Sequence, residues 1–390
     1  MRQSRLPAGG TNLFQAIKAT REEARAKGVK ILDLSVGQPA GPALWRARQV
    51  ASLAVLSDDE KMHEYQDNEC RPDCIPNFAE RFVLGHLRTH PTDVRYLPIP
   101  GIKPMLGLIP MACGSDLKVV ATTTNPGYPT PRVWCKYLGK EVFEPTTNPE
   151  NKFLFDPQEL PTNVGLLLTN YPHNPSGAVS PEEHLYHLCA FCQEHGIRIG
   201  NDAAYAALAY GADSCCLADI APMFPKLSWM EMFSASKLIA NGTGWRIGAM
   251  VGSPDFIGDI ATIKGNTDSG FVAPMAAGVI DVFENDKRSI LAVRDLYQNR
   301  VLTLRSVLLG AGMRLALEPR AGFFTLWLAP KFAFGKEMED AKAFNLAMIE
   351  NTGVVGVHFP PYIRYAVAHE DVEAMAGDIK AAFEKAQVGY

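Results

Sequence analysis

Residues 234–248, SASKLIANGTGWRIG, carry the densest chemical signal in the chain. Lys237 stands between the hydroxyl residues Ser234 and Ser236 and a glycine-rich run that ends in Arg246. An amine condenses with an aldehyde, while hydroxyl groups and a guanidinium neutralise and orient a phosphate. The segment therefore predicts a site for a small molecule that has both groups. A lone lysine of this kind would more often lie in a solvated turn.

The sequence before this segment alternates short apolar runs with amphipathic stretches. LKVVATTT (117–124), VGLLLTN (164–170) and GIRIGND (196–202) predict buried strands, and residues 181–195 predict a helix between the last two. Such alternation is typical of a largely parallel sheet that is covered by helices.

Near Ala276 the pattern changes to long helical stretches, followed by a strand-like GFFTLWLA (322–329) and an amphipathic helix around 372–387. A length of 390 residues suits two packed domains. We predict an N-terminal arm with part of a small domain over 1–40, a large domain over 41–275, and a small C-terminal domain over 276–390.

Composition limits the kinds of partner. The 38 basic and 42 acidic side chains give a net charge of −4, which would attract neither nucleic acid nor an anionic membrane. No apolar run has the length of a secretory signal or a membrane span, so we expect a cytoplasmic protein. The eight cysteines, including adjacent Cys215 and Cys216, form no dense framework, and we expect them to be unpaired.

Several side chains of the types that ligate metals crowd the helix predicted over 181–195. They are spread around the helix rather than confined to one face, so packing on the sheet is the better interpretation and we predict no metal site. The residues are His184, His187, Cys189, Cys192 and His195.

Residues 234–248 resemble the S-x-S-K…G-x-R-x-G signature of the class I/II, fold-type I aminotransferases. Three further segments match this family in the same order: NYPHNPSG (170–177), NDAAY (201–205) and YIRYAVA (362–368). The resemblance runs from about Asp33 to the end of the chain. It implies an α/β protein with a large domain, whose mostly parallel sheet is flanked by helices, and a smaller α+β domain. It also implies pyridoxal 5′-phosphate (PLP) as cofactor and transfer of an amino group between an amino acid and a 2-oxo acid.

The resemblance assigns roles to the central residues. Lys237 would hold PLP as a Schiff base and transfer protons, and Asp202 would pair with the pyridine nitrogen, whose protonated form a buried carboxylate favours. Asn174 and Tyr205 would contact the phenolic oxygen, with Asn174 also near the substrate, and Arg364 would bind the substrate α-carboxylate. Locally, an aspartate at a strand end and an asparagine before a proline also suit caps and turns.

The resemblance implies further contacts with the cofactor and the substrate. Tyr128 would stack on the PLP ring, although a half-buried core tyrosine is the competing interpretation. The backbone at the start of a helix would hold the phosphate, together with Ser234, Ser236 and Arg246. That helix start is expected at Gly101, Ile102 and Lys103.

The resemblance also predicts a homodimer. Tyr65, Asn266 and Thr267 are candidates to reach the phosphate site of the neighbouring subunit. Gly37, within one subunit, would let the backbone approach the substrate carboxylate.

Two departures from the family pattern concern spacing. Arg246 lies one residue further from Lys237 than is usual, and the stretch before Arg364 is shorter than in relatives. The short stretch would leave room for a long substrate, or it would expose the site to water and reduce closure. Gly101-Ile102-Lys103 and GNTDSGFVAP (265–274) together resemble the branch that handles diaminopimelate or its N-succinyl derivative. The same cofactor residues would also serve a lyase, decarboxylase or oxidase, and a non-enzymatic protein that inherited the fold is a second alternative.

Overall fold

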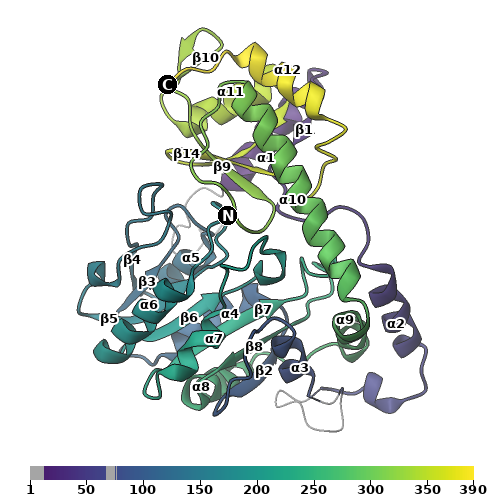
Figure 1. The fold of residues 1–390 in the computed structure, drawn as a ribbon, viewed down its shortest axis with the longest axis vertical. Helices are drawn as coiled ribbons and strands as arrows, with labels where there is room; N and C mark the ends of the chain where they lie inside the picture. The colour runs from purple at the N-terminus through teal and green to yellow at the C-terminus, as the bar shows by residue number, and fades with distance from the viewer. Residues whose placement is uncertain (1–12, 67–74, 76) are drawn as a thin grey trace, which may run out of the picture.

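The computed structural model describes residues 13–66, 75 and 77–390 (Figure 1). Within these residues the larger part of the molecule contains a seven-stranded mixed sheet in the order β2-β8-β7-β6-β5-β3-β4. Strands β7, β6, β5, β3 and β4 are parallel, whereas β8 is antiparallel to both its neighbours. The strands are β2 Arg95–Ile99, β3 Val119–Thr122, β4 Glu141–Phe143, β5 Val164–Thr169, β6 Arg198–Asp202, β7 Trp229–Ser234 and β8 Gly248–Gly252.

Helices cover both faces of this sheet. Successive residues of a strand point to opposite faces, so Leu166 packs in one apolar cluster and Leu167 in another. The cluster around Leu166 includes α4 and α8, and the cluster around Leu167 includes α3, α6, α7 and α9. The helices of this part are α2 Trp45–Val55, α3 Phe78–Leu84, α4 Ile102–Ala112, α5 Thr130–Tyr137, α6 Glu182–His195, α7 Leu217–Ile220, α8 Pro254–Lys264 and α9 Ala273–Asn285.

The three apolar runs that predict buried strands form β3, β5 and β6, and the helix predicted between the last two is α6. The prediction of a largely parallel sheet flanked by helices is therefore confirmed. Cys189 and Cys192 of α6 are buried in the core, and the His195 ring stacks on Phe191. Among the described residues no group of His, Cys, Asp and Glu side chains is arranged to hold a metal ion.

The smaller part is built on a three-stranded antiparallel sheet, β13-β14-β9. The strand predicted over 322–329 is β9, Phe324–Leu328, and the predicted final helix is α12, Ala376–Ala386. The other elements are α1 Leu13–Ala26, β1 Leu32–Asp33, β10 Phe332–Ala333, β11 Lys336–Glu337, α11 Ala341–Thr352, β12 Val354–Val355, β13 Val357–Phe359 and β14 Tyr362–Ala366.

Helix α10, Lys287–Gly310, runs from the larger part into the smaller one (Figure 1). Its Ile290 side chain lies in the core of the large sheet, whereas Val293 lies in the core of the smaller part. The buried side chains of α9 also join the core of the large sheet. The domain limits over 1–40, 41–275 and 276–390 stay a prediction.

Short 3-10 turns complete the described secondary structure: η1 Glu60–Met62, η2 Pro157–Glu159, η3 Ala206–Leu208 and η4 Ala221–Met223. In the part of the chain that the structure describes, no helix combines the length and the apolar character needed to cross a bilayer. The cysteines at 113, 135, 189, 192, 215 and 216 are free, as expected for these positions.

Candidate active site

The carboxyl ends of the parallel strands bring the sequence motifs together. Asn170 follows β5, Asp202 ends β6, and Lys237 comes three residues after the end of β7. These strands are neighbours in the sheet and run in the same direction, so the three side chains start from one edge. This edge of an open α/β sheet is where ligands usually bind.

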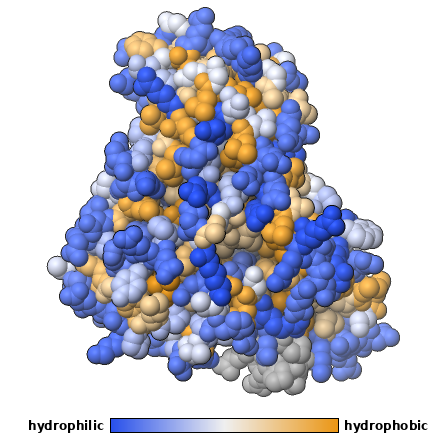
Figure 2. Space-filling model, in the orientation of Figure 1, coloured by the Kyte–Doolittle hydropathy of each residue, from blue (hydrophilic) through white to orange (hydrophobic). Residues whose placement is uncertain are grey.

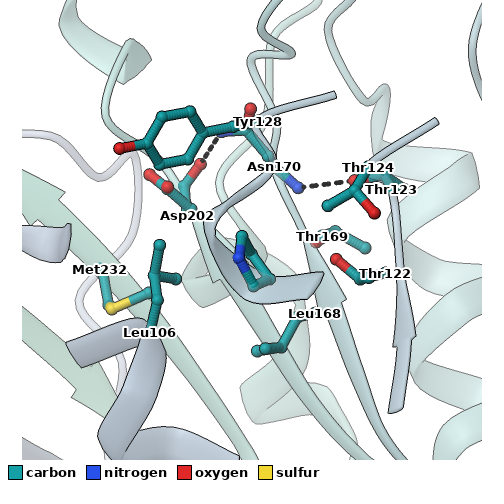
Figure 3. A pocket seen from close by; sticks show the side chains of 11 residues that line it. Leu106, Thr122, Thr123, Thr124, Tyr128, Leu168, Thr169, Asn170, Asp202 and Met232 are labelled. Atoms are coloured by element: carbon teal, nitrogen blue, oxygen red, sulfur yellow. Dashed lines mark hydrogen bonds between the residues drawn. The ribbon is translucent and has the colours of Figure 1, made fainter. Parts of the chain in front are cut away.

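A pocket at this edge is shown in Figure 3. Tyr128 and Asp202 both line this pocket, and threonine side chains occupy another side of it. Asn170 joins the strands around it, because its side chain donates to the Asp202 carbonyl (2.8 Å) and its backbone N–H donates to Thr123 Oγ1 (3.2 Å). The lining residues are Leu106, Thr122, Thr123, Thr124, Tyr128, Pro131, Leu168, Thr169, Asn170, Asp202 and Met232.

Asp202 and Lys237 form an electrostatically coupled pair within the protein. Burial raises the pKa of Asp202 to about 6, against the opposing effects of the Ala204 N–H and the Lys237 charge. Burial also lowers the pKa of Lys237, while Asp202 acts in the opposite direction. Because the protein interior solvates both charges poorly, a cationic N–H group placed beside Asp202 would be strongly favoured.

Arg364 is buried on β14 and held by groups from two other segments. Its Nη1 donates to Asn174 Oδ1 (3.0 Å) and its Nη2 donates to the Ser35 carbonyl (2.8 Å). The guanidinium carbon lies 4.3 Å from the Phe324 ring centroid and 5.7 Å from that of Phe359. Burial lowers the pKa of Arg364 to about 10, and the buried Nε atom has no hydrogen-bond partner. Arg364 is thus a cation whose position is fixed by its neighbours, and its remaining N–H groups can donate to an anion.

Tyr205 lies close to this cation. Its ring packs edge-on against Phe323 and Phe324, and burial raises the pKa of its phenol, against the effect of Arg364. The Gly37 backbone also lies against Phe324, since a Cβ atom at Gly37 would be 3.4 Å from the edge of that ring. Asn174, Tyr205, Arg364 and Gly37 are therefore grouped on the side of the site that faces the smaller part.

Gly101 and Arg246 meet at the start of α4. Gly101 has φ 75°, and a Cβ atom there would lie 2.4 Å from Arg246 Nη2. The guanidinium donates to the Thr243 carbonyl (2.8 Å) and the Pro100 carbonyl (2.9 Å). No side chain caps α4, so the backbone N–H groups of its first turn, at Ile102 and Lys103, remain for a ligand. The Lys103 side chain itself is exposed.

The remaining hydroxyl groups expected at a phosphate lie at the end of β7 and just after it. Ser234 and Ser236 are both buried, and their Oγ atoms are 2.8 Å apart in a hydrogen bond. Ser234 Oγ also accepts the N–H of Ser236 (3.2 Å).

This donor set fits PLP at both ends of the cofactor. A helix start with uncapped N–H groups, together with a guanidinium that only a glycine lets approach, suits a phosphate. A buried carboxylate with a raised pKa suits a protonated pyridine nitrogen, and a coupled amine, Lys237, suits the aldehyde.

Three residues expected to act across subunits lie apart from this group. Tyr65 is 90% exposed, and Asn266 and Thr267 are exposed just after α8. Asn266 Nδ2 donates to the Thr262 carbonyl and Thr267 Oγ1 donates to the Lys264 carbonyl, so both side chains bond to nearby backbone.

Sequence reasoning missed a buried polar network beneath the site. Asn201 Oδ1 accepts from Thr169 Oγ1 and the Tyr171 N–H (both 2.9 Å), while its Nδ2 donates to the Tyr171 carbonyl (2.8 Å) and Glu231 Oε1 (2.7 Å). The other oxygen of Glu231 accepts the Ala218 N–H (2.8 Å). Burial raises the pKa of Glu231 to about 7. A glutamate within the apolar strand WMEMFS was the available signal, because such a group needs a partner.

The class of protein is a PLP enzyme of fold type I. It is indicated by the seven-stranded sheet, the smaller α+β part, and the lysine and aspartate whose charges interact at the strand ends. The chain belongs to the aminotransferase class I and II family, whose model matches residues 29–376. It is therefore a PLP-dependent transferase of amino groups, and the alternative reactions that the cofactor residues would also serve are not favoured.

Similar proteins agree with this assignment. The chain is 30% identical to an LL-diaminopimelate aminotransferase of Dehalococcoides mccartyi (strain 195) over 390 residues, covering 96% of each protein. It is 28% identical to LL-diaminopimelate aminotransferase 2 of Trichormus variabilis over 370 residues, covering 92% of this chain and 89% of the relative. Substrate-bound BacF of Bacillus subtilis has a TM-score of 0.85 at 18% identity, covering 100% of this chain and 99% of BacF, which shows the shared fold.

Proposed function

We propose that this aminotransferase acts on an extended amino acid of the diaminopimelate type and that 2-oxoglutarate or glutamate completes the cycle. The relatives from Trichormus and Dehalococcoides are named for diaminopimelate. The structural observation that supports this substrate class is the tight hairpin that precedes Arg364.

In this hairpin Phe359 of β13 pairs with Tyr362 of β14, so only Pro360 and Pro361 connect the two strands. Arg364 follows two residues after Tyr362. A turn this short carries no lid over the carboxylate side of the site. The space beyond the α-carboxylate therefore suits a long substrate chain.

Lys237 is the residue to which we assign both cofactor attachment and proton transfer. Bound PLP supplies an aldehyde that combines with amines and a ring that accepts electrons from the substrate. Burial lowers the pKa of Lys237, which increases the fraction of free amine near neutral pH. With PLP bound, the free amine would be the form that takes a proton from the substrate Cα, and the resulting ammonium would be the form that returns it to the cofactor.

Asp202 and Asn174 orient the reacting groups in this proposal. Asp202 holds the proton on the pyridine nitrogen by charge pairing. Asn174 Oδ1 accepts a hydrogen bond from Arg364 Nη1. The Nδ2 of Asn174 would then be available to donate to the phenolic oxygen of the cofactor, alongside Tyr205. Arg364 binds the α-carboxylate with the N–H groups that Asn174 and Ser35 leave free, and Gly37 lets the backbone approach the same carboxylate.

The phosphate is assigned to the cluster at the start of α4. The N–H groups of Ile102 and Lys103 in the uncapped first turn would donate to it, and Gly101, which has no Cβ, lets the Arg246 guanidinium approach. Arg246 supplies the balancing charge, with Ser234 and Ser236 as hydroxyl donors. Tyr128, which lines the same pocket as Asp202 (Figure 3), provides the surface on which the ring stacks.

A homodimer is proposed because the side of the molecule around α2 exposes apolar residues (Figure 2). Leu56, just after α2, is 77% exposed, and Trp45, Leu53 and Val272 are also exposed. Exposed apolar surface of this kind is typical of interfaces between proteins. Tyr65 lies next to this surface in sequence and is the candidate to reach the partner's phosphate site.

The variant Leu56→Asp tests the dimer, because a charge at this position would oppose burial in an interface. Sedimentation velocity is expected to give dimers for the unchanged protein and monomers for Leu56→Asp. Leu291→Asp, at an exposed position on α10, is the matched control and should stay dimeric. A fully active monomer of the unchanged protein would refute the proposal.

We also propose that the enzyme works in the cytoplasm. The six cysteines of the described residues are free, and most are buried where oxidation would disturb packing. A reducing compartment keeps such thiols unpaired.

The substrate class is tested by single-turnover reactions with individual amino acids, which are followed by the visible absorbance of the cofactor. Diaminopimelate-type and similarly extended amino acids are expected to react faster than alanine and aspartate. A faster reaction with alanine or aspartate would reject the extended substrate and would leave the roles of Lys237 and Asp202 unaffected.

A further inference from the structure

The segment that precedes Gly37 is joined to Arg364 through its backbone. Strand β1 pairs with β12, and the Leu34 carbonyl then accepts the N–H of Ala366 on β14 (2.7 Å). One residue further, the Ser35 carbonyl accepts Arg364 Nη2 (2.8 Å). The segment therefore lies beside β14 and supplies one of the two oxygen acceptors that hold the guanidinium.

Asp33 fixes the position of Ser35. Its Oδ1 accepts both the Ser35 Oγ–H (2.6 Å) and the Ser35 N–H (3.1 Å). Its Oδ2 accepts Arg21 Nη1 of helix α1 (2.6 Å). Asp33 is only 9% exposed, so this carboxylate is screened little by water and both its oxygens are used. The helix, the carboxylate and the Ser35 carbonyl form one continuous support that ends at Arg364.

The support matters because the aromatic rings around Arg364 cannot set its full orientation. Phe324 and Phe359 lie against the guanidinium and restrain its plane, but stacking permits rotation within that plane. The two hydrogen bonds to Asn174 and Ser35 fix the rotation. Asn174 is shared with the cofactor in the proposed function, which leaves the Ser35 carbonyl as the acceptor that serves Arg364 alone.

We propose that Asp33, held by Arg21, is a positioning residue for recognition of the substrate α-carboxylate. The inference rests on the proposed role of Arg364. Asp33 touches neither the substrate nor the cofactor, and it acts by holding the Ser35 carbonyl where it aligns the guanidinium. A misaligned guanidinium could not donate two parallel hydrogen bonds to the substrate carboxylate.

The test compares Asp33→Ala with the unchanged enzyme in single-turnover reactions with the amino acid that reacts fastest. The half-saturating concentration of that amino acid is expected to rise about tenfold, because a charge-assisted hydrogen bond is weakened rather than deleted. The rate at saturation and the dissociation constant for PLP are expected to change less than about twofold. A role in folding alone would instead change the PLP dissociation constant or the saturating rate.

Three further variants separate the possible causes. Asp33→Asn keeps an Oδ1 acceptor for Ser35 and is expected to restore most of the affinity. Lys30→Ala breaks an exposed ion pair with Asp378 in the same region and is expected to have no effect. Arg364→Ala is expected to raise the half-saturating concentration about a hundredfold.

An unchanged half-saturating concentration in Asp33→Ala, with the large increase in Arg364→Ala, would overturn the role of Asp33 alone. An unchanged value in Arg364→Ala would overturn the proposed role of Arg364 and, with it, this inference. An equal effect of Lys30→Ala would also overturn the inference, since it would point to general loosening of the segment.

Discussion

Replacing Asp202 by asparagine should raise the stability of the cofactor-free protein and should reduce the further stabilisation that bound PLP provides. The folded-state pKa of Asp202 is raised from 3.8 to about 6, so ionisation of this carboxyl opposes folding. The penalty is absent below pH 4, grows between pH 4 and pH 6, and is complete above pH 6. Asparagine keeps the acceptor for the Ala204 N–H and removes the charge.

The size of the effect follows from the shift. About two pKa units correspond to roughly 3 kcal/mol at pH 8, and this shift already includes the attraction of the Lys237 charge, which opposes the effect of burial. Urea denaturation of the cofactor-free protein at pH 8 should therefore show a higher free energy of unfolding for Asp202→Asn, and the difference should shrink as the pH falls towards 4.

Asp281→Asn provides a control of opposite sign. Hydrogen bonding and charge pairing with Arg46 lower the pKa of Asp281, so its charge stabilises the fold at neutral pH and the asparagine variant should lose stability. With PLP added, Asp202→Asn should gain less stability than the unchanged protein, because an amide pairs poorly with a pyridinium. If Asp202→Asn is no more stable than the unchanged protein at pH 8 without cofactor, ionisation of Asp202 does not oppose folding.

Two further predictions concern the supports of the site. Asn201→Ala removes four buried hydrogen bonds and should lower the free energy of unfolding by roughly 3–5 kcal/mol in urea denaturation. Asn345→Ala, which loses two bonds with Gly356 and a longer one with His358 Nδ1 (3.4 Å), should cost less, and equal costs would contradict this ranking. Gly101→Ala places a Cβ against Arg246 and should weaken PLP binding about tenfold in equilibrium dialysis, while Gly139→Ala, which shares a positive φ but meets open space, should not.

The sequence predicts much of the fold and the cofactor side of the site. Apolar runs at 117–124, 164–170 and 196–202 predict neighbouring parallel strands, and the ends of such strands necessarily meet. The apolar run before Asp202 places this carboxylate at the end of a buried strand, whereas Lys237 is matched to the same site only through the family resemblance.

The supporting contacts could not be predicted, because they depend on how distant segments are aligned. Asn201 reaches Glu231 only because β6 and β7 pair in the observed register. Asp33 reaches Arg364 through the backbone of Ser35, and backbone contacts leave no side-chain pattern in the sequence.

The conformation of the loop between Lys237 and Arg246, which is one residue longer than the family pattern, could not be predicted either. Ala240 and Arg246 take positive φ values of 59° and 55° in this loop. Residues other than glycine rarely take a left-handed backbone, so the sequence gives no signal for this conformation. Arg246 then meets the Pro100 carbonyl and the start of α4, although its spacing in the sequence departs from the family pattern.

Attachment of the cofactor to Lys237 can be tested by reduction with borohydride, which makes a Schiff base permanent. The reduced protein is digested, and the peptide that carries the cofactor is identified by mass spectrometry. The cofactor is expected on Lys237 in the unchanged protein, and no reducible link is expected in Lys237→Ala. Finding the reduced cofactor on any other lysine, or an intact link in Lys237→Ala, would contradict it.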